Sequence, residues 1–582
     1  MNTEVILNIL KLLGGLGMFL FGMNVMGDGL EKRGGGSLKS ILENLTSNRL
    51  KGVALGALVT AVIQSSSATT VMVVGFVNSG LMSLSQSIGV IMGANIGTTI
   101  TAWLLSLSGI EGDGFLMQML KPENFSLIFA TIGIVLSFSK KEKHKDVGNI
   151  LLGFTVLMYG MKMMSGAVAP LKESETFTQI LVMFSNPLLG VLTGALLTAI
   201  IQSSSASVGI LQALCSTGAV YYSNAIPIIM GQNIGTCITA IISAIGANRN
   251  AKRVSVVHLS FNIIGTVAFL VLFYTIHNLV GFAFYDDVMN PADIATVHTI
   301  FNLFTTLLLI PFTKQLEKLA YFVIKDKDTA NEIQLLDERL LETPAVAVQQ
   351  SKIVTLKMMH IATESLSKAL DLLGSKFTDA AAEEIEALEN EVDTFEDKLG
   401  TYLVKLSRHS LNYEDSHQIS SLLHTIGDFE RMSDHAVNLV DSAREIHEKK
   451  VEFSEEGRRE IQTMANAIRE IIGLTATAFE HNDLAVAAQI EPLEQVIDGL
   501  KYKLKKGHIA RLQQNDCTIE TGFVFNDLIT NFERIADHCS NIAVCMIEVE
   551  NDSFGTHEYL HKLHHKEHFE EKFKEFEAKY SL

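Results

Sequence analysis

Long apolar runs alternate with short polar segments over the first 313 residues of the chain. A helix that spans a bilayer needs about 20 predominantly apolar residues, and most of these runs reach that length. They predict an all-α, polytopic membrane part. The candidate spans are 5–27, 52–78, 84–108, 124–139, 148–169, 187–217, 224–246, 254–280 and 294–313.

Beyond Pro311 the pattern changes to long, charged, amphipathic stretches with few turn residues. Such periodicity indicates soluble helices. The chain therefore divides into a membrane part and a soluble part. The expected divisions are 1–318 for a transmembrane domain, 319–344 for a linker, 345–548 for a soluble domain and 549–582 for a charged, His-rich tail.

The membrane part contains an internal repeat. Gln64-Ser65-Ser66-Ser67 recurs as Gln202-Ser203-Ser204-Ser205, and Asn95-Ile96-Gly97-Thr98 recurs as Asn233-Ile234-Gly235-Thr236, both at an offset of 138 residues. The same amides and hydroxyls thus lie twice in the middle of apolar segments. This arrangement predicts one polar site built from two related halves, as in many secondary transporters.

Charge is distributed unevenly between the polar segments. Basic residues concentrate in 31–51, 140–145 and 249–253, whereas 109–123 and 285–293 are mainly acidic. By the positive-inside rule the basic segments are expected in the cytoplasm, and each repeated element then crosses the membrane opposite to its copy. We therefore expect two inverted-topology repeats, at about 5–139 and about 148–313.

Each Gln-Ser-Ser-Ser motif interrupts an apolar run with four polar residues, which predicts re-entrant or broken helices. The N-termini of such half-helices present free N–H groups to an oxyanion, and nearby oxygens suit sodium. A single Ser-Ser-Ser more often serves helix packing, but two copies in opposed halves favour binding. The candidate substrate- and sodium-binding residues are Gln64, Ser65, Ser66, Ser67, Asn95, Thr98, Gln202, Ser203, Ser204, Ser205, Asn233 and Thr236.

A short His-x-x-Phe-Asn pattern also occurs twice, with His258 and Asn262 in the first copy and His298 and Asn302 in the second. Residues four apart share one helix face, and polar residues in a membrane helix are expected to face the protein interior. These residues suit either gating or proton transfer, or hydrogen bonds between helices.

Paired Gln-Ser-Ser-Ser motifs in inverted repeats, each followed by Asn-Ile-Gly-Thr, resemble the type II sodium–phosphate cotransporter family, in its bacterial branch. The resemblance covers about residues 5–313. It implies that both Gln-Ser-Ser-Ser segments bind phosphate and sodium at the repeat interface. Animal electrogenic members carry an Asp shortly after the first Asn-Ile-Gly-Thr, whereas here Ala102–Ser108 holds no acid, so the resemblance leaves the sodium stoichiometry and electrogenicity open.

The soluble part is strongly acidic. Residues 341–582 carry 44 acidic and 25 basic side chains, which leaves 20 acidic and 21 basic for residues 1–340 out of totals of 64 and 46. A phosphate backbone requires a basic surface, so we expect no nucleic-acid partner.

A second repeat lies in the soluble part, and it predicts two three-helix bundles in series. Residues 428–435 (Asp-Phe-Glu-Arg-Met-Ser-Asp-His) recur as residues 531–538 (Asn-Phe-Glu-Arg-Ile-Ala-Asp-His). Acidic pairs four residues apart share a helix face and could hold iron, zinc, manganese or magnesium; a solvated face neutralised by Arg431 and Arg534 is the alternative. The candidate metal ligands are Glu389, Asp393, Glu430, Asp434, Glu494, Asp498, Glu533 and Asp537.

Two bundles with Glu-Arg-x-x-Asp-His look like a PhoU domain, the regulator associated with bacterial phosphate uptake. The match spans about residues 345–548. In the tail, His557, His561, His564 and His568 share one helical face, which suits a metal or a solvated polar helix.

Together the two resemblances imply sodium-coupled transport of inorganic phosphate across a bacterial inner membrane, with a cytoplasmic PhoU-like regulatory domain. The expected partners are phosphate, sodium and the lipid bilayer, with a homodimer or a phosphate-signalling protein as further possibilities. The alternatives are a membrane-anchored phosphate sensor and a transporter of another oxyanion. No P-loop, nucleophile elbow or HExxH motif occurs, so we expect no enzymatic activity.

Overall fold

The structure is a computed structural model of the 582-residue chain. It describes residues 3–43, 48–109, 121–325, 336–374, 377–409, 411–514, 516–550 and 567–582. Contacts divide the chain into two units, Met1–Val346 and Ala347–Leu582. Apart from one isolated β-bridge between Tyr221 and Val288, the regular structure of the described ranges is helical.

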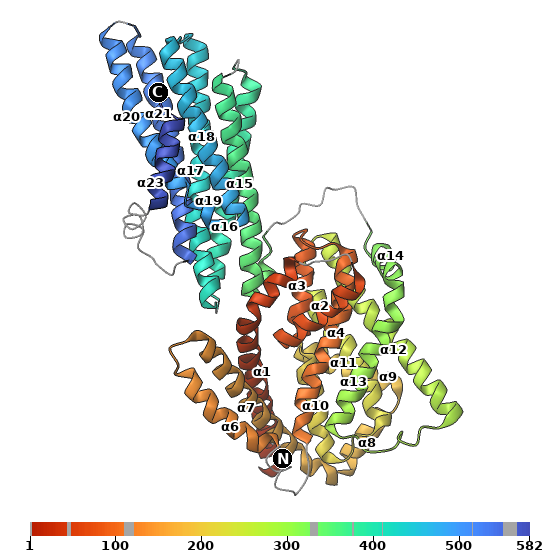
Figure 1. Cartoon of the computed structure of the whole chain (residues 1–582). Coiled ribbons are helices and arrows are strands. Elements are labelled where there is room, and N and C mark those ends of the chain that lie inside the picture. Colours follow the sequence, from red (N-terminus) through yellow and green to blue (C-terminus); the bar gives the residue numbers. More distant parts are fainter. Residues whose placement is uncertain are drawn as a thin grey trace. The chain divides into compact units, whose positions relative to one another are not determined.

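The first unit is a bundle of membrane helices (Figure 1). Among the described residues, six helices are long and apolar enough to cross a membrane, so the chain is a multi-pass membrane protein. The helices of this unit are α1 (Thr3–Glu43), α2 (Arg49–Ile63), α3 (Ser66–Asn78), α4 (Leu84–Ser106), α6 (Pro122–Ser137), α7 (Glu142–Val168), α8 (Glu175–Met183), α9 (Pro187–Ile201), α10 (Ser204–Leu214), α11 (Tyr222–Ser243), α12 (Arg249–Val280), α13 (Pro291–Leu309) and α14 (Thr313–Val323).

Helices α1 and α7 lie side by side and run antiparallel (Figure 1). A Cβ added to Gly15 would lie 2.9 Å from the Met164 nitrogen, and one added to Gly22 would lie 2.3 Å from the Leu157 nitrogen, so residues later in α1 meet residues earlier in α7. Small residues permit this backbone contact between membrane helices. Because α7 is the sequence copy of α1, the antiparallel pairing confirms that the repeats are inverted.

The Gln-Ser-Ser-Ser segments form re-entrant hairpins. Helices α2 and α4 are parallel, because Gly56 contacts Val90 and Gly97 contacts Ala57 along both helices. Helix α3 therefore runs back from the end of α2 to the start of α4. Helices α9, α10 and α11 repeat this arrangement, since α9 and α11 pack through equivalent contacts. Residues 52–78 and 187–217 thus enter the membrane unit and return to the face from which they started, instead of crossing it, which confirms the predicted re-entrant helices.

The charge asymmetry of the sequence corresponds to two faces of the first unit. The Arg49 carbonyl lies at Gly89 near the start of α4, and Asn248, which precedes Arg249, bonds to the end of α3 at Asn78. We call this the basic face. The other hairpin ends at the opposite face, where Gln212 of α10 donates to the Pro291 carbonyl at 2.9 Å. Both hairpin tips therefore point toward the middle of the unit.

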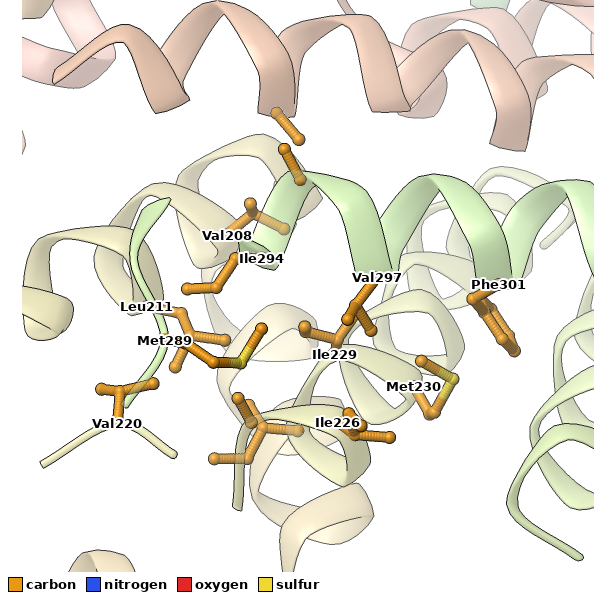
Figure 2. Packing of buried hydrophobic residues seen from close by; sticks show 14 residues of the cluster. Val208, Leu211, Val220, Ile226, Ile229, Met230, Met289, Ile294, Val297 and Phe301 are labelled. Atoms are coloured by element: carbon orange, nitrogen blue, oxygen red, sulfur yellow. The ribbon is translucent and has the colours of Figure 1, made fainter. Parts of the chain in front are cut away.

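A continuous apolar core fixes the second hairpin (Figure 2). It joins α10 and α11 to α13, and Ala102 of α4 also belongs to it. The residues labelled in Figure 2 are Val208, Leu211, Val220, Ile226, Ile229, Met230, Met289, Ile294, Val297 and Phe301.

The second unit consists of two groups of three long helices, as the sequence predicts. Helices α17 and α21 pack against one another and join the groups, while α15 contacts α16 through Lys368–Glu384 (2.5 Å) and α18 through Asp371–Arg469 (2.7 Å). The helices are α15 (Pro344–Gly374), α16 (Asp379–Leu406), α17 (Tyr413–Lys449), α18 (Glu455–His481), α19 (Leu484–Ala487), α20 (Ile490–Gln513), α21 (Ile519–Glu550) and α23 (Glu567–Lys579).

The chain end packs onto this unit. Tyr580 is buried, and Lys579 pairs with Glu470 of α18 at 2.7 Å. Of the tail histidines that the sequence singled out, His557, His561 and His564 lie outside the described residues, as does the side chain of His568.

The α1–α7 contact generates a prediction with an internal control. Gly22→Ala places a methyl group against the Leu157 backbone, whereas a Cβ on Gly17 of the same helix meets nothing within 4 Å. Because backbone cannot move aside as a side chain can, we expect Gly22→Ala to destabilise the fold by about 1–3 kcal/mol. Gly17→Ala should be neutral or slightly stabilising, since Ala is the better helix former. Thermal unfolding of the purified protein in detergent measures both variants, and equal midpoints would contradict the packing described.

Candidate functional site

Each hairpin tip is a left-handed turn followed by a capped helix start. Gln64 and Gln202 end α2 and α9 with φ angles of 58° and 59°. Ser65 and Ser203 then cap α3 and α10, and their hydroxyls accept from the backbone N–H groups of Ala68 and Ala206 at 3.1 and 3.2 Å. An α-helix cannot bond its first N–H groups internally, and the serine cap accepts from the third helical residue, so the N–H groups of the first two helical positions stay available for a ligand.

The two tips meet. The Ser66 and Ser204 hydroxyl oxygens lie 3.4 Å apart, and the Ser67 hydroxyl donates to the Gln202 carbonyl at 3.4 Å. Ser66, Ser204 and Ser205 are buried. The starts of α3 and α10, one from each repeat, therefore bring hydroxyls and N-terminal amides into one small polar region.

The two glutamines differ despite their equivalent backbone. Gln64 is 7% exposed; its Oε1 accepts from the Thr101 hydroxyl at 3.0 Å and its Nε2 donates to the Ala61 carbonyl at 2.5 Å. Gln202 is exposed. Thr239, the counterpart of Thr101, donates instead to the Thr236 carbonyl of its own helix. One tip thus holds its glutamine against α4, while the other leaves its glutamine exposed.

The hydroxyls behind the tips show the same asymmetry. In the first repeat the Thr60 hydroxyl donates to Thr69 at 3.0 Å. Their counterparts, Thr198 and Ser207, are both buried and have no hydrogen-bond partner among the described residues. Gln232 lies beside them, and its Nε2 donates to the Ser207 carbonyl.

The Asn-Ile-Gly-Thr side chains are buried but bond mainly within their own helices. Asn95, Thr98, Asn233 and Thr236 each donate to the carbonyl four residues earlier, at 2.9–3.0 Å. These bonds do not join them to the serines. One contact leaves the helix: Asn233 Oδ1 lies 3.4 Å from His298 Nε2.

A buried polar seam between α12 and α13 extends the polar interior. His258, Asn262, His298 and Asn302 each keep one polar atom with no hydrogen-bond partner in the described ranges. The sequence analysis predicted that His258 and Asn262 share one helix face and that His298 and Asn302 share another. It missed the threonines that complete the seam, although Thr266 and Thr305 follow at helical spacing from Asn262 and His298.

In the second unit, the first helix group brings three predicted metal ligands together. One carboxylate oxygen each from Glu389, Asp393 and Asp434 lies within 4.8 Å of the others. Burial, then the Asp393 charge, raises the pKa of Glu389. Burial, then Asp434, raises the pKa of Glu430 to about 7. Crowded carboxylates with these properties fit a hard cation with oxygen ligands.

The second helix group uses the equivalent residues differently. Lys501 pairs with Glu533 at 2.6 Å, and Arg534 pairs with Asp537 at 3.3 Å. Burial and nearby acidic groups raise the pKa of Asp498. Burial, followed by the charge of a neighbouring glutamate, raises the pKa of Glu494 to about 8. Within the described residues the second group does not form the three-carboxylate cluster of the first.

The duplicated eight-residue motif also links the two groups, a role that its sequence did not reveal. His538 Nδ1 lies 2.9 Å from Asp428 Oδ1, and His435 Nδ1 lies 2.9 Å from Asn531 Oδ1. The first residue of each copy thus contacts the last residue of the other copy, across α17 and α21. The recurrence of the motif was visible in the sequence, but the contact between its two copies was not.

Comparison with known proteins agrees with this division. The Na+/Pi-cotransporter family model matches residues 18–166 and again residues 156–285, one match for each repeat. The PhoU domain model matches residues 355–443 and 461–546, one match for each helix group.

Curated relatives extend the similarity over the chain. A putative inorganic phosphate export protein, YjbB of Salmonella typhimurium, is 24% identical and covers 95% of this chain and 100% of its own. The uncharacterized protein YqeW of Bacillus subtilis is 30% identical and covers 53% of this chain and 96% of its own. Sodium-dependent phosphate transport protein 2A of Rattus norvegicus is 36% identical over 18% of this chain and 16% of its own. The chain therefore belongs to the Na+/Pi-cotransporter family and carries a PhoU domain after its membrane unit.

Proposed function

We propose that the protein is a sodium-coupled carrier of inorganic phosphate whose site is the meeting point of the two hairpin tips. The observation that carries this proposal is the 3.4 Å approach of the Ser66 and Ser204 hydroxyls at two opposed helix N-termini. Each N-terminus contributes a partial positive charge and free N–H donors. An oxyanion can be bound there without a basic side chain.

Phosphate is the anion that the family and two named relatives favour. Sodium is supported by the family description and by the rat relative's name. Hydroxyl and carbonyl oxygens of Ser65, Ser67, Ser203 and the glutamines are suitable ligands for such a hard cation. Net flux in a reversible carrier follows the combined gradients, so the export named for the Salmonella relative and uptake are compatible with one site.

Alternating access is supported by the asymmetry between the repeats. Gln64 is folded onto α4 whereas Gln202 is exposed, and the Thr60–Thr69 bond has no counterpart at Thr198. In inverted repeats, two conformations of one sequence can exchange between the halves, which moves access from one face to the other.

The proposed orientation places the basic face in the cytoplasm of a bacterial inner membrane. Asp337 precedes the PhoU domain by a few residues, still belongs to the first unit, and accepts a hydrogen bond from Asn78 at the basic face. The chain therefore leaves the membrane unit at this face. The PhoU domain would then be cytoplasmic. Its Glu389, Asp393 and Asp434 cluster is proposed to hold a divalent or iron-type cation.

The serine pair yields the first test of the site. We expect Ser66→Ala/Ser204→Ala to lower sodium-driven uptake of labelled phosphate into proteoliposomes about a hundredfold at limiting phosphate, because two hydroxyl bonds to a charged ligand are lost. The fold should persist, since removing both partners leaves neither hydroxyl unpaired.

Ser87→Ala serves as the matched control, because this buried serine of α4 bonds only to the Leu84 carbonyl of its own helix among the described contacts. Normal uptake by the double variant would overturn the site. Transport of sulfate or arsenate in place of phosphate would indicate another oxyanion, and phosphate binding without flux in the wild type would favour a sensor.

The two glutamines should respond differently to truncation. Gln64→Ala removes a buried pair of hydrogen bonds, whereas Gln202→Ala removes an exposed side chain. Both positions share the same left-handed backbone, so its strain cancels in the comparison. We expect Gln64→Ala to be less stable than Gln202→Ala by about 1 kcal/mol in thermal unfolding, while both lower uptake. Equal stability would contradict the asymmetry.

The carboxylate cluster predicts metal binding that strengthens with pH. Protons compete with a metal for carboxylates, and the pKa values of Glu389 and Glu430 are raised, the latter to about 7. Manganese binding by the full chain, measured by equilibrium dialysis, should therefore be tighter at pH 8 than at pH 6. Asp434→Asn should weaken it and Asp537→Asn should not; equal loss in both variants would refute the assignment to the first helix group.

A further inference from the structure

The segment that joins the two units is packed into the basic face of the membrane unit. Residues 337–343, called the docking segment below, contain the short 3-10 helix η5 (Glu338–Glu342). Asp337, Leu340, Leu341 and Thr343 are all buried, with Leu340 fully so. Connecting segments normally run over the surface, so this burial sets the docking segment apart from a spacer.

Asn78 at the end of α3 is the centre of the contact. Its Nδ2 donates to Asp337 Oδ2 at 2.8 Å, and its Oδ1 accepts from the Asn248 N–H at 2.7 Å. The Asn248 side chain also donates to the Asn78 carbonyl at 2.7 Å. Asn78 is 2% exposed. One buried amide therefore joins the first repeat, the turn that follows α11 of the second repeat, and the docking segment.

Arg339 ties the docking segment to the second repeat directly. Its Nη1 donates to Asp337 Oδ2 at 2.8 Å, and its Nη2 donates to the Ile245 carbonyl at 3.3 Å. The Asp337 carboxylate thus lies between an amide of the first repeat and a guanidinium held by the second. Such charge-assisted bonds are stronger than neutral ones.

Leu340 fits against α3 only because residue 75 is glycine. A Cβ on Gly75 would lie 2.7 Å from Leu340 Cδ2. In the second repeat the positions equivalent to Gly75 and Asn78 are Ala213 and Ser216. Both features that receive the docking segment are therefore specific to the copy whose end lies at the basic face.

Helix α3 connects this contact to the transport site. It begins at Ser66, and its 13 residues span about 20 Å to Asn78. Movement of α3 relative to the α11–α12 turn requires the Asn78 junction to open. The residue after the docking segment, Pro344, is the first residue of α15, which leads into the PhoU domain.

We propose that residues 337–343 form a regulatory latch, which clamps α3 of the first repeat to the α11–α12 turn of the second. This inference rests on the proposed transport function, because the latch regulates exchange between the carrier's two conformations. The docked state restrains that exchange. Opening the latch frees the far end of the helix that carries Ser66.

Hydrogen exchange of the full-length protein in detergent tests whether the latch exists. Asp337→Asn removes the charge that holds Asn78 and Arg339, and Gly75→Ala displaces Leu340 without altering any charge. We expect either variant to accelerate amide exchange at the end of α3 and at Asn248 about tenfold. Glu342→Gln is the matched control, because it neutralises an exposed carboxylate of the same segment. Unchanged exchange in both latch variants would overturn the proposal.

Phosphate flux in proteoliposomes tests whether the latch regulates transport. Flux in Asp337→Asn and Gly75→Ala should exceed that of the wild type and of Glu342→Gln about fivefold, a modest coupling between sites. Accelerated exchange with unchanged flux would refute the regulatory role. A wild type that moves no phosphate would refute the proposed transport function instead, and the exchange data would then decide whether the segment docks.

Discussion

Every helix end inside a membrane protein must satisfy its backbone polar groups without bulk water, and the membrane unit is organised by its response to that constraint. In each re-entrant hairpin the first helix ends at a left-handed glutamine and the second begins at a capping serine, whose hydroxyl accepts from one of the unbonded N–H groups of that helix. The N–H groups at the first two positions of α3 and α10 remain, and these two helix starts face one another. What a helix cannot satisfy internally becomes the candidate ligand-binding surface.

Much of this arrangement could be predicted from the sequence. The common offset and the charge bias together predicted inverted repeats, and the four polar residues in each apolar run predicted an interrupted helix. In the structure the Ser66 and Ser204 hydroxyls, one from each repeat, lie 3.4 Å apart, while the binding role of these residues stays a prediction. The difference between Gln64 and Gln202 could not be predicted, because the two local sequences are alike and only the surrounding helices distinguish them. The contact between Asp337 and Asn78 also could not be predicted, because a segment this short shows no hydrophobic periodicity in the sequence.

The PhoU domain shows how duplicated motifs diverge in use. Both helix groups carry the same acidic pairs, yet only the first gathers three carboxylates among the described residues. In the second group Lys501 pairs with Glu533, and the aligned position of the first group is Glu396. That single charge reversal was visible in the sequence. Aligning the two copies position by position would have separated the group whose carboxylates cluster from the group whose carboxylates pair with basic side chains.

The glycine contact between α1 and α7 has a consequence for how the membrane unit can be built. The two helices are copies of one another, they run antiparallel, and matched glycines line both sides of the contact: Gly15, Gly22, Gly153 and Gly160. Such an interface is isologous, the self-complementary kind that relates the subunits of a two-fold dimer. The single chain therefore contains, between its own halves, the contact by which two separate copies of one half-length protein, inserted in opposite orientations, would recognise each other.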